Sequence, residues 1–178
     1  MKANHGSIIQ YAGTSNPSGA VALNDRLFIV GDDEDNQLRI YDCNRFDKPI
    51  QTLSLSNLFK GVIKDGEDLE VDIESMATIN HVLFIIGSHS TSRTGEYRPA
   101  RHRLIALQFK LDANKKLTVN PIGEIYTQLI DSLKQDSRFN NYQFDKAEKL
   151  PPKAIGGLSI EGLASTPDNG LLIGFRNP

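Results

Sequence analysis

The chain has 178 residues, of which 39% are hydrophobic and 24% are charged, a composition that indicates a globular domain and excludes a disordered segment. Its formal net charge of −2 leaves no surplus of Lys and Arg for phosphate contacts, so we expect no nucleic-acid partner. The single cysteine, Cys43, cannot form an internal disulfide, and no stretch approaches the ~18 apolar residues of a membrane span. We therefore expect a soluble, cytoplasmic protein with no membrane partner.

Three similar windows follow one another along the chain, and each predicts a β-hairpin. Aligned on Ala22, Ala77 and Ala164, each shows short apolar alternation, a polar turn and an apolar run that closes on glycine. These runs are too short for globular helices and are rich in strand-forming residues. Further strands are expected at 37–42 and 50–55 after the first hairpin, and at 103–111 and 117–125 after the second.

The windows lie 55 and 87 residues apart, from Ala22 to Ala77 and from Ala77 to Ala164, which is more than the ~40 to 45 residues of a four-stranded unit and predicts insertions near residues 54–68 and 125–158. Residues 56–61 look like one helical turn with Ser56 as its cap and Gly61 as its stop. Apolar residues recur at helical spacing over 125–136, which favours an amphipathic helix there. Residues 138–152 are typical of a polar loop.

Four antiparallel strands repeated every ~40 to 45 residues are typical of propeller blades. The sequence therefore predicts an all-β fold, a β-propeller of four-stranded antiparallel blades with short helical insertions. The chain ends after the second strand of the third window, at about two and a half blades, which would leave strand edges unpaired. We expect residues 1–178 to be one propeller-like domain and the N-terminal part of a longer domain. The alternative is a small complete sandwich.

Strand direction predicts which polar residues share one face of such a propeller. Because blade strands run alternately in opposite directions, the loop that leads into the first strand and the loop that follows the second lie at the same end. That end would carry Asp32, Asp33, Glu74, His89, Arg101, Arg103, Glu161, Arg176 and Asn177.

The carboxylates of this face suggest a site for Ca²⁺, which takes six to eight oxygen ligands. In a strand over 68–74, Asp68, Glu70, Asp72 and Glu74 would point to one side. A solvated acidic edge is the alternative, and we prefer it for Asp68 and Glu70. Glu74 stands apart because Glu161 recurs at the equivalent place in the third window.

The loop after the second hairpin is basic, and arginine suits carboxylate or phosphate groups. It could hold an anionic ligand, or it could form ion pairs with Asp32, Asp33 and Glu34 of the neighbouring blade. His89 is the candidate general base or metal ligand on this face, and a structural histidine is the alternative.

A resemblance to a known family spans nearly the whole chain. It is carried by Val30–Asn36, Leu38–Tyr41, Asp72–Glu74, Ile86–His89, Arg101–Leu104, Ile160–Ala164 and Gly174–Pro178. These segments resemble the bacterial domain-of-unknown-function family numbered thirty-six sixteen, which implies a propeller-like fold in a longer protein of unassigned activity. The acidic motif before the hairpins also looks like that of phytase-like esterase and strictosidine-synthase-like propellers. In those proteins acidic residues lie near a metal in the channel mouth, although Ser75 stands here where that motif has glycine.

The resulting hypothesis is a metal-assisted hydrolase, in which Ca²⁺ at the channel mouth polarises a phosphate or ester oxygen. The roles would be metal binding by Glu74, Glu161, Asp32 and Asp33, catalysis by His89, and substrate binding by Arg101, Arg103, Arg176 and Asn177. The competing hypothesis is a non-catalytic propeller that binds a small anionic ligand or a protein partner on this face.

Overall fold

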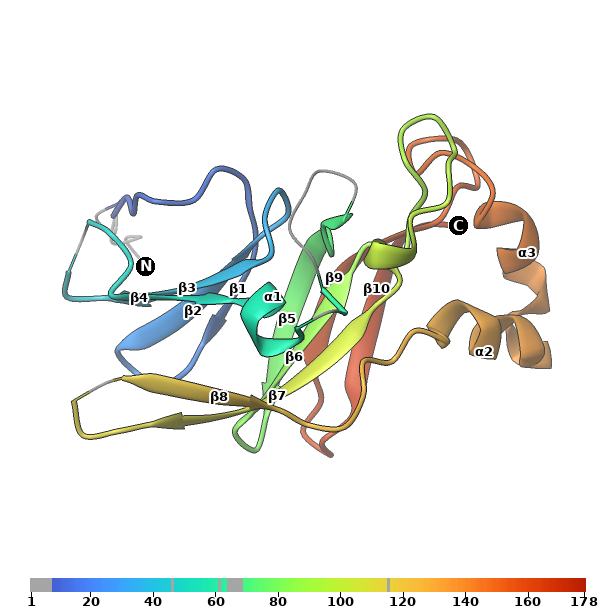
Figure 1. Cartoon of the computed structure of the whole chain (residues 1–178). Helices are drawn as coiled ribbons and strands as arrows, with labels where there is room; N and C mark the ends of the chain where they lie inside the picture. The colour runs from blue at the N-terminus through green and yellow to red at the C-terminus, as the bar shows by residue number, and fades with distance from the viewer. Residues whose placement is uncertain (1–7, 46, 61, 64–68, 115) are drawn as a thin grey trace, which may run out of the picture.

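The computed structural model describes residues 8–45, 47–60, 62–63, 69–114 and 116–178, and within them the chain is mostly β. Figure 1 shows two four-stranded antiparallel sheets and a two-stranded hairpin, arranged in chain order from the N-terminal to the C-terminal side. The first sheet consists of β1 (Pro17–Ala22), β2 (Leu27–Asp32), β3 (Gln37–Asp42) and β4 (Gln51–Ser54). The second consists of β5 (Ile73–Ile79), β6 (Val82–Gly87), β7 (Leu104–Leu111) and β8 (Leu117–Pro121). The hairpin consists of β9 (Ser159–Ser165) and β10 (Leu171–Asn177).

The three predicted hairpins and the two strands after each of the first two are confirmed, because the strands pair consecutively in both sheets. Short helices occupy the connections: α1 (Leu55–Leu58), the 3-10 helix η2 (Pro99–Arg101), α2 (Leu129–Gln135), the 3-10 helix η3 (Ser137–Tyr142) and α3 (Phe144–Ala147). No helix among the described residues has the length and apolar character needed to cross a bilayer.

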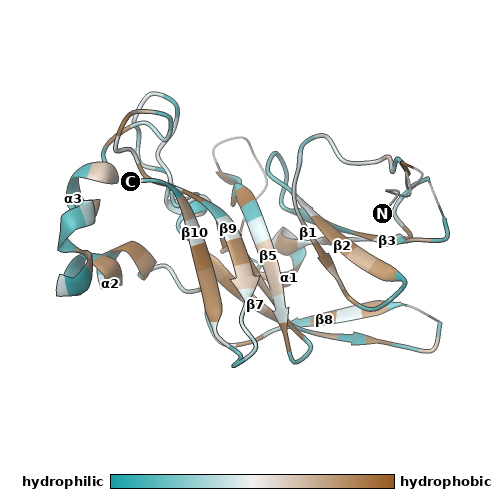
Figure 2. Ribbon diagram, turned by 180° about the vertical axis from the view of Figure 1, so that it is seen from behind, coloured by the Kyte–Doolittle hydropathy of each residue, from teal (hydrophilic) through white to brown (hydrophobic). Residues whose placement is uncertain are grey.

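The first strands of the three units lie beside one another. Strand β5 contacts β1 on one side and β9 on the other, and Figure 2 shows the three strands as neighbours. The Ser18 hydroxyl donates to the Ile73 carbonyl across the first junction. At the second junction the Ile160 N–H donates to the Ser88 carbonyl at 2.9 Å. Each unit is therefore tied to the next near its first strand.

Apolar side chains fill the spaces between the units. One core cluster joins the first two sheets and includes Ile29, Leu38 and Ile85, each fully buried. A second joins the second sheet to the hairpin and is built around Ile86 and Ile160. A third holds α2 and α3 against the hairpin. Since complete burial of one such side chain is worth about 1.5–3 kcal/mol, these clusters hold the units in place.

Two of the three glycines that close the apolar runs, Gly31 and Gly87, are required by close packing. A Cβ at Gly87 would lie 2.4 Å from the Arg101 carbonyl oxygen and 2.5 Å from that of Val71. A Cβ at Gly31 would lie 2.8 Å from the Ile73 side chain of the next sheet. Glycine lets backbone and side chains approach where any larger residue would clash.

Two predicted boundaries shift for local reasons. The helix after β4 is capped by Ser54, whose hydroxyl accepts from the Asn57 N–H at 3.4 Å, and not by Ser56; Gly61 lies outside the described residues. Strand β8 ends at Pro121, which has no N–H to continue the ladder.

Three other predictions are wrong in part. The strand predicted over 68–74 does not form as such: β5 begins at Ile73, and Asp72 has a φ of 55°, so the alternation of side chains breaks there. Asp68 lies outside the described residues. The helix predicted over 125–136 begins only at Leu129, because Tyr126 pairs with Leu104 in a β-bridge. The polar loop predicted over 138–152 contains η3 and α3, and Phe144 is buried there.

Candidate functional site

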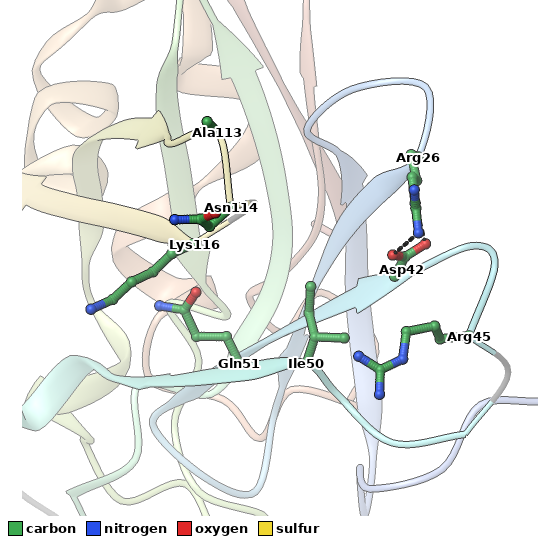
Figure 3. A pocket seen from close by; sticks show the side chains of 8 residues that line it. All are labelled: Arg26, Asp42, Arg45, Ile50, Gln51, Ala113, Asn114 and Lys116. Atoms are coloured by element: carbon green, nitrogen blue, oxygen red, sulfur yellow. Dashed lines mark hydrogen bonds and ion pairs between the residues drawn. The ribbon is translucent and has the colours of Figure 1, made fainter.

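The two ends of the strands carry hollows of different character. At the end with the β7–β8 turn, a hollow of about 580 Å³ is lined by basic residues, among them Arg26, Arg45 and Lys116 (Figure 3). Arg26 is paired there with Asp42 at 2.7 Å. None of the residues predicted to form the site lies in this hollow.

The opposite end holds a hollow of about 670 Å³ that receives side chains from all three units. We call it the acidic hollow, after the carboxylates that line it: Asp33, Glu34, Glu70, Asp72, Glu74 and Glu161. The basic residues in its lining are Arg93, Arg101, Lys153 and Arg176. Of the four predicted metal ligands, the structure brings Asp33, Glu74 and Glu161 together here.

The first strand of every unit has a register shift at the position where the acidic hollow lies. In β1 the shift falls between Pro17 and Gly19, and in β5 it falls between Ile73 and Ser75. In the β9–β10 pair, Gly174 faces Gly162 and Phe175 faces Ile160, so the shift in β9 falls at Glu161. The residues left without a partner in the ladder are Ser18, Glu74 and Glu161. An extra residue of this kind turns its side chain out of the regular alternation, so the shifts direct both glutamates into one hollow.

Glu74 is the least compensated carboxylate of the acidic hollow. It is partly buried, and among the described residues it has neither an ion pair nor a hydrogen bond. Burial raises the pKa of its carboxyl to about 8, helped by the charges of Asp72, Glu161 and Asp33 and opposed by Arg176. Near neutral pH this group therefore holds a proton in the structure as it stands.

Glu161 lines the same hollow as Glu74 and already has partners of its own. Its carboxylate accepts from Arg176 at 2.8 Å and from the Ser159 hydroxyl at 2.9 Å. Arg176 therefore lines the hollow as predicted but contacts a carboxylate of its own hairpin. Asn177 donates to the Pro152 carbonyl at 3.0 Å, and it does not line the hollow.

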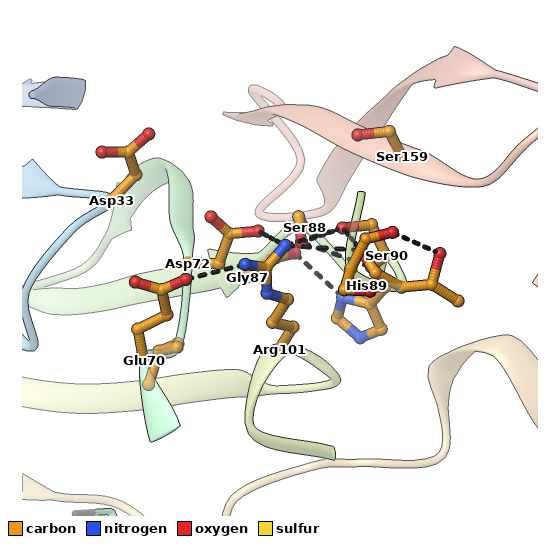
Figure 4. A network of polar contacts seen from close by, with 12 residues as sticks. Asp33, Glu70, Asp72, Gly87, Ser88, His89, Ser90, Arg101 and Ser159 are labelled. Carbon is orange, nitrogen blue, oxygen red and sulfur yellow. Dashed lines mark hydrogen bonds and ion pairs between the residues drawn. The ribbon is translucent and has the colours of Figure 1, made fainter. Parts of the chain in front are cut away.

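Arg101 closes one side of the hollow (Figure 4). Its guanidinium pairs with Glu70 at 2.7 Å and with Asp72 at 2.9 Å, and it also reaches the Ser90 hydroxyl at 3.3 Å. Ion pairing of the basic loop was expected with the neighbouring sheet. Arg101 instead pairs with the segment that leads into its own sheet, because the loop through η2 folds back over that segment.

The two aspartates at the end of β2, Asp32 and Asp33, differ sharply. Asp32 is fully buried, and its oxygens accept from the backbone N–H groups of Ser15, Asn16 and Glu34. Although burial raises its pKa, these hydrogen bonds outweigh burial and lower it. Asp32 does not line the hollow and serves to fix the loop. Asp33 does line it: one oxygen accepts from the Asn16 side chain at 2.8 Å, and the other is buried without a hydrogen bond.

The structure does not bring His89 into the hollow. His89 is 1% exposed, its Nδ1 donates to the Gly87 carbonyl at 2.9 Å, and its ring lies 5.4 Å from that of His102. Burial lowers its pKa to about 4. The backbone leaves strand geometry at His89, where φ is 53°. Glu74 lines the acidic hollow and His89 does not, so the prediction that they share one rim is not met. Arg103 lines a different hollow, and one guanidinium nitrogen donates to the Val62 carbonyl at 2.9 Å.

Arg93, which belongs to the basic loop predicted to open on this face, does line the acidic hollow, whereas Ser90, Lys153 and Ser159 were missed from the sequence. The glutamate that recurs in β5 and β9, Glu74 and Glu161, could have suggested the register shifts. No comparable signal marks the others, because their places depend on how the long loops fold.

A comparison with known families identifies the family of this chain. The family described as "Protein of unknown function (DUF3616)" matches residues 16–120, from the start of β1 almost to the end of β8. No curated protein matches the chain. The matched residues include Asp33, Asp72 and Glu74 and leave out Glu161. Because the match covers more than half of its residues, the chain belongs to the DUF3616 family.

Proposed function

We propose that the acidic hollow binds a divalent cation, Ca²⁺ first among the candidates, and with it a small anionic ligand. The observation that carries this proposal is the equivalent register shift in β5 and β9, which directs Glu74 and Glu161 toward one space. Carboxylate oxygens are the donors that Ca²⁺ takes, and its variable coordination suits a site formed from several loops.

The carboxylates would have to move closer together to hold the cation. Within the described ranges, no three His, Cys, Asp or Glu side chains are already arranged as a metal-coordinating group. Glu74 has no partner to give up, and it would exchange its proton for the cation. Glu161 would give up Arg176, which lies 2.8 Å away. The released guanidinium could then contact the anionic group of the ligand.

A propeller arrangement accounts for the position of the hollow. In this proposal the sheets are successive blades, with β1, β5 and β9 as the innermost strands. The contacts of β5 with both other strands support it. The acidic hollow would then lie at the mouth of the central channel, where further blades would add to its wall.

Hydrolysis of a phosphate or ester is the second candidate function, and the raised pKa of Glu74 favours it. A carboxyl with a pKa of about 8 is protonated near neutral pH and can donate that proton to a leaving group. Glu74 would then be the general acid, whereas the sequence suggested His89 as a general base or metal ligand. Loss of activity toward phenyl phosphate or ethyl acetate, whose leaving groups need a proton, in Glu74→Gln would support this candidate, and unchanged turnover would dismiss it.

Equilibrium dialysis with Ca²⁺ tests the binding proposal. We expect the wild-type chain to bind Ca²⁺, and Glu74→Gln and Glu161→Gln each to weaken binding at least tenfold. Asp25→Asn is the control, since Asp25 is exposed in the β1–β2 turn at the other end of the strands. Absence of Ca²⁺ binding in the wild type, or equal binding in all four chains, would refute the proposal.

A further inference from the structure

A third hollow, of about 810 Å³, lies beside the η2 loop and is distinct from the acidic hollow. We call it the histidine hollow, and it is formed by the end of α1, the start of β7 and the stretch between β8 and α2. Its lining includes Phe59, Tyr97, His102, Arg103, Ile125 and Asp131. The two hollows have no lining residue in common.

Two residues that line this hollow each carry a buried nitrogen atom that has no hydrogen-bond partner among the described residues. His102 is 6% exposed, and its Nε2 has none. Arg103 uses Nη2 to donate to the Val62 carbonyl, while its Nη1 is buried and unpaired. Buried polar atoms are ordinarily hydrogen-bonded, so a pair of unsatisfied nitrogens on adjacent residues points to an acceptor supplied by a ligand.

The charge of Arg103 also has no counter-charge among the described residues. No carboxylate within the described part of the chain lies within ion-pair distance of its guanidinium. Arginine stays charged in proteins, and its fork of donors suits a planar carboxylate. His102 can add a second donor, because a neutral imidazole carries its proton on one nitrogen, and that nitrogen can be Nε2.

The remaining wall favours an apolar body for such a ligand. Tyr97 is 61% exposed and its ring centroid lies 4.7 Å from that of His102, while Val62 is 56% exposed. Phe59 and Ile125 complete this side. Large exposed apolar side chains gathered around one hollow are typical of a binding surface, and aromatic walls suit a ring.

The acidic groups at the rim limit the charge of the ligand. Asp131 lines the hollow, although Lys134 pairs with it at 2.7 Å, and Glu124 is exposed at the edge. Glu124 would repel a ligand with several negative charges, whereas a single carboxylate can be hydrogen-bonded by Arg103 and His102.

We propose that the histidine hollow binds a small organic monocarboxylate with an aromatic or otherwise apolar body. The carboxylate accepts from Arg103 Nη1 and from His102 Nε2, and the ring lies against Tyr97 and Ile125.

Fluorescence anisotropy with 2-naphthoate tests this site, and it is free of tryptophan background because the chain has none. We expect the wild type to bind 2-naphthoate with a sub-millimolar Kd and to bind neutral 2-naphthamide at least tenfold more weakly. Arg103→Met should weaken binding of 2-naphthoate at least tenfold. Arg138→Met is the matched control, since Arg138 is 79% exposed on η3, and it should bind like the wild type.

Two outcomes overturn the proposal: no binding of 2-naphthoate by the wild type, or equal affinity for 2-naphthoate and 2-naphthamide. The second comparison needs no variant, so it holds even if Arg103→Met fails to fold. His102→Phe keeps the ring and removes the nitrogen, and unchanged affinity in this variant would remove His102 from the site. Equilibrium dialysis with Ca²⁺ on the same protein tests the acidic hollow separately, so the two proposals can fail independently.

Discussion

At the scale of single residues, Glu74 combines burial, neighbouring charge and the absence of a partner. Its folded pKa of about 8 lies above the ordinary 4.5. The folded chain holds this proton more tightly than the unfolded chain, so the protonated carboxyl contributes to stability. This contribution is fully present below about pH 4.5 and is lost as the pH rises through 8. We expect Glu74→Gln to reduce this loss by on the order of 2 kcal/mol, after allowance for solvent screening.

Denaturant unfolding at pH 5, 7 and 9 measures this effect. Glu96→Gln is the control, because Glu96 is 68% exposed and should leave the pH dependence as it is in the wild type. If the wild type and Glu74→Gln lose stability equally between pH 5 and 9, Glu74 does not hold a proton in the folded chain.

Gly87 is a second residue whose environment makes a definite prediction. Gly87→Ala would place a methyl group 2.4 Å from one carbonyl oxygen and 2.5 Å from another, and backbone atoms cannot yield easily. We expect a loss of about 2–4 kcal/mol in the free energy of unfolding. Gly162→Ala is the control, with its nearest neighbour at 3.6 Å, and it should cost under about 0.5 kcal/mol. Chemical denaturation that finds the two variants equally stable would contradict the close approach.

At the scale of elements, Arg101 fastens the segment before β5 to the η2 loop. Arg101→Met would remove the partner of Glu70 and Asp72, leaving two partly buried carboxylates near other acidic groups. We expect a loss of about 2 kcal/mol, because unpaired buried charge costs more than the pair contributes.

The exposed pair of Arg138 and Asp136 gives the matched comparison for this prediction. Arg138→Met should change stability by less than about 0.5 kcal/mol, since exposed ion pairs contribute little. Thermal unfolding of both variants decides the matter, and equal melting temperatures would show that Arg101 does not fasten the segment.

The strands could be predicted from the sequence because their signal is local. Alternating and apolar runs such as Leu83–Ile86 lie in strands, and the turns between them are polar. The start of β5 could not be placed, since Asp72 breaks the alternation only through its backbone angle. The helical insertion after Ser137 was missed because Phe144 is one buried residue in a polar stretch, and its burial against Phe175 of β10 is tertiary.

At the scale of the whole molecule, the three units should unfold together. Ile160 is fully buried between the second sheet and the hairpin. Ile160→Ala should cost about 2–5 kcal/mol, as large-to-small changes in cores do, and should lower amide protection in β5 and β6 as well as in β9. Leu172→Ala, with 62% of the residue exposed, should do neither. Hydrogen exchange confined to β9 and β10 in Ile160→Ala would mean that the hairpin unfolds independently.

The candidate site was predictable only where it depends on strand direction. Strand direction predicted that Asp33, Glu74 and Glu161 lie at the same end of the strands, and all three line the acidic hollow. The sequence could not show that Asp33 lines the hollow and Asp32 does not, because Asp32 is held by hydrogen bonds from the distant loop at Ser15. His89 and Arg103 belong to a long loop whose path follows from packing, and neither side chain reaches the acidic hollow.

The central claim is that Glu74 and Glu161 together hold a cation, and the position of a bound ion tests it most directly. Crystals of the chain grown with Ca²⁺ should show anomalous density within about 2.3–2.6 Å of a carboxylate oxygen from each glutamate, as calcium coordination requires. Arg176 should then have moved away from Glu161. A crystal with an ordered acidic hollow that contains no ion, or with Ca²⁺ bound elsewhere and the Arg176–Glu161 pair intact, would contradict it.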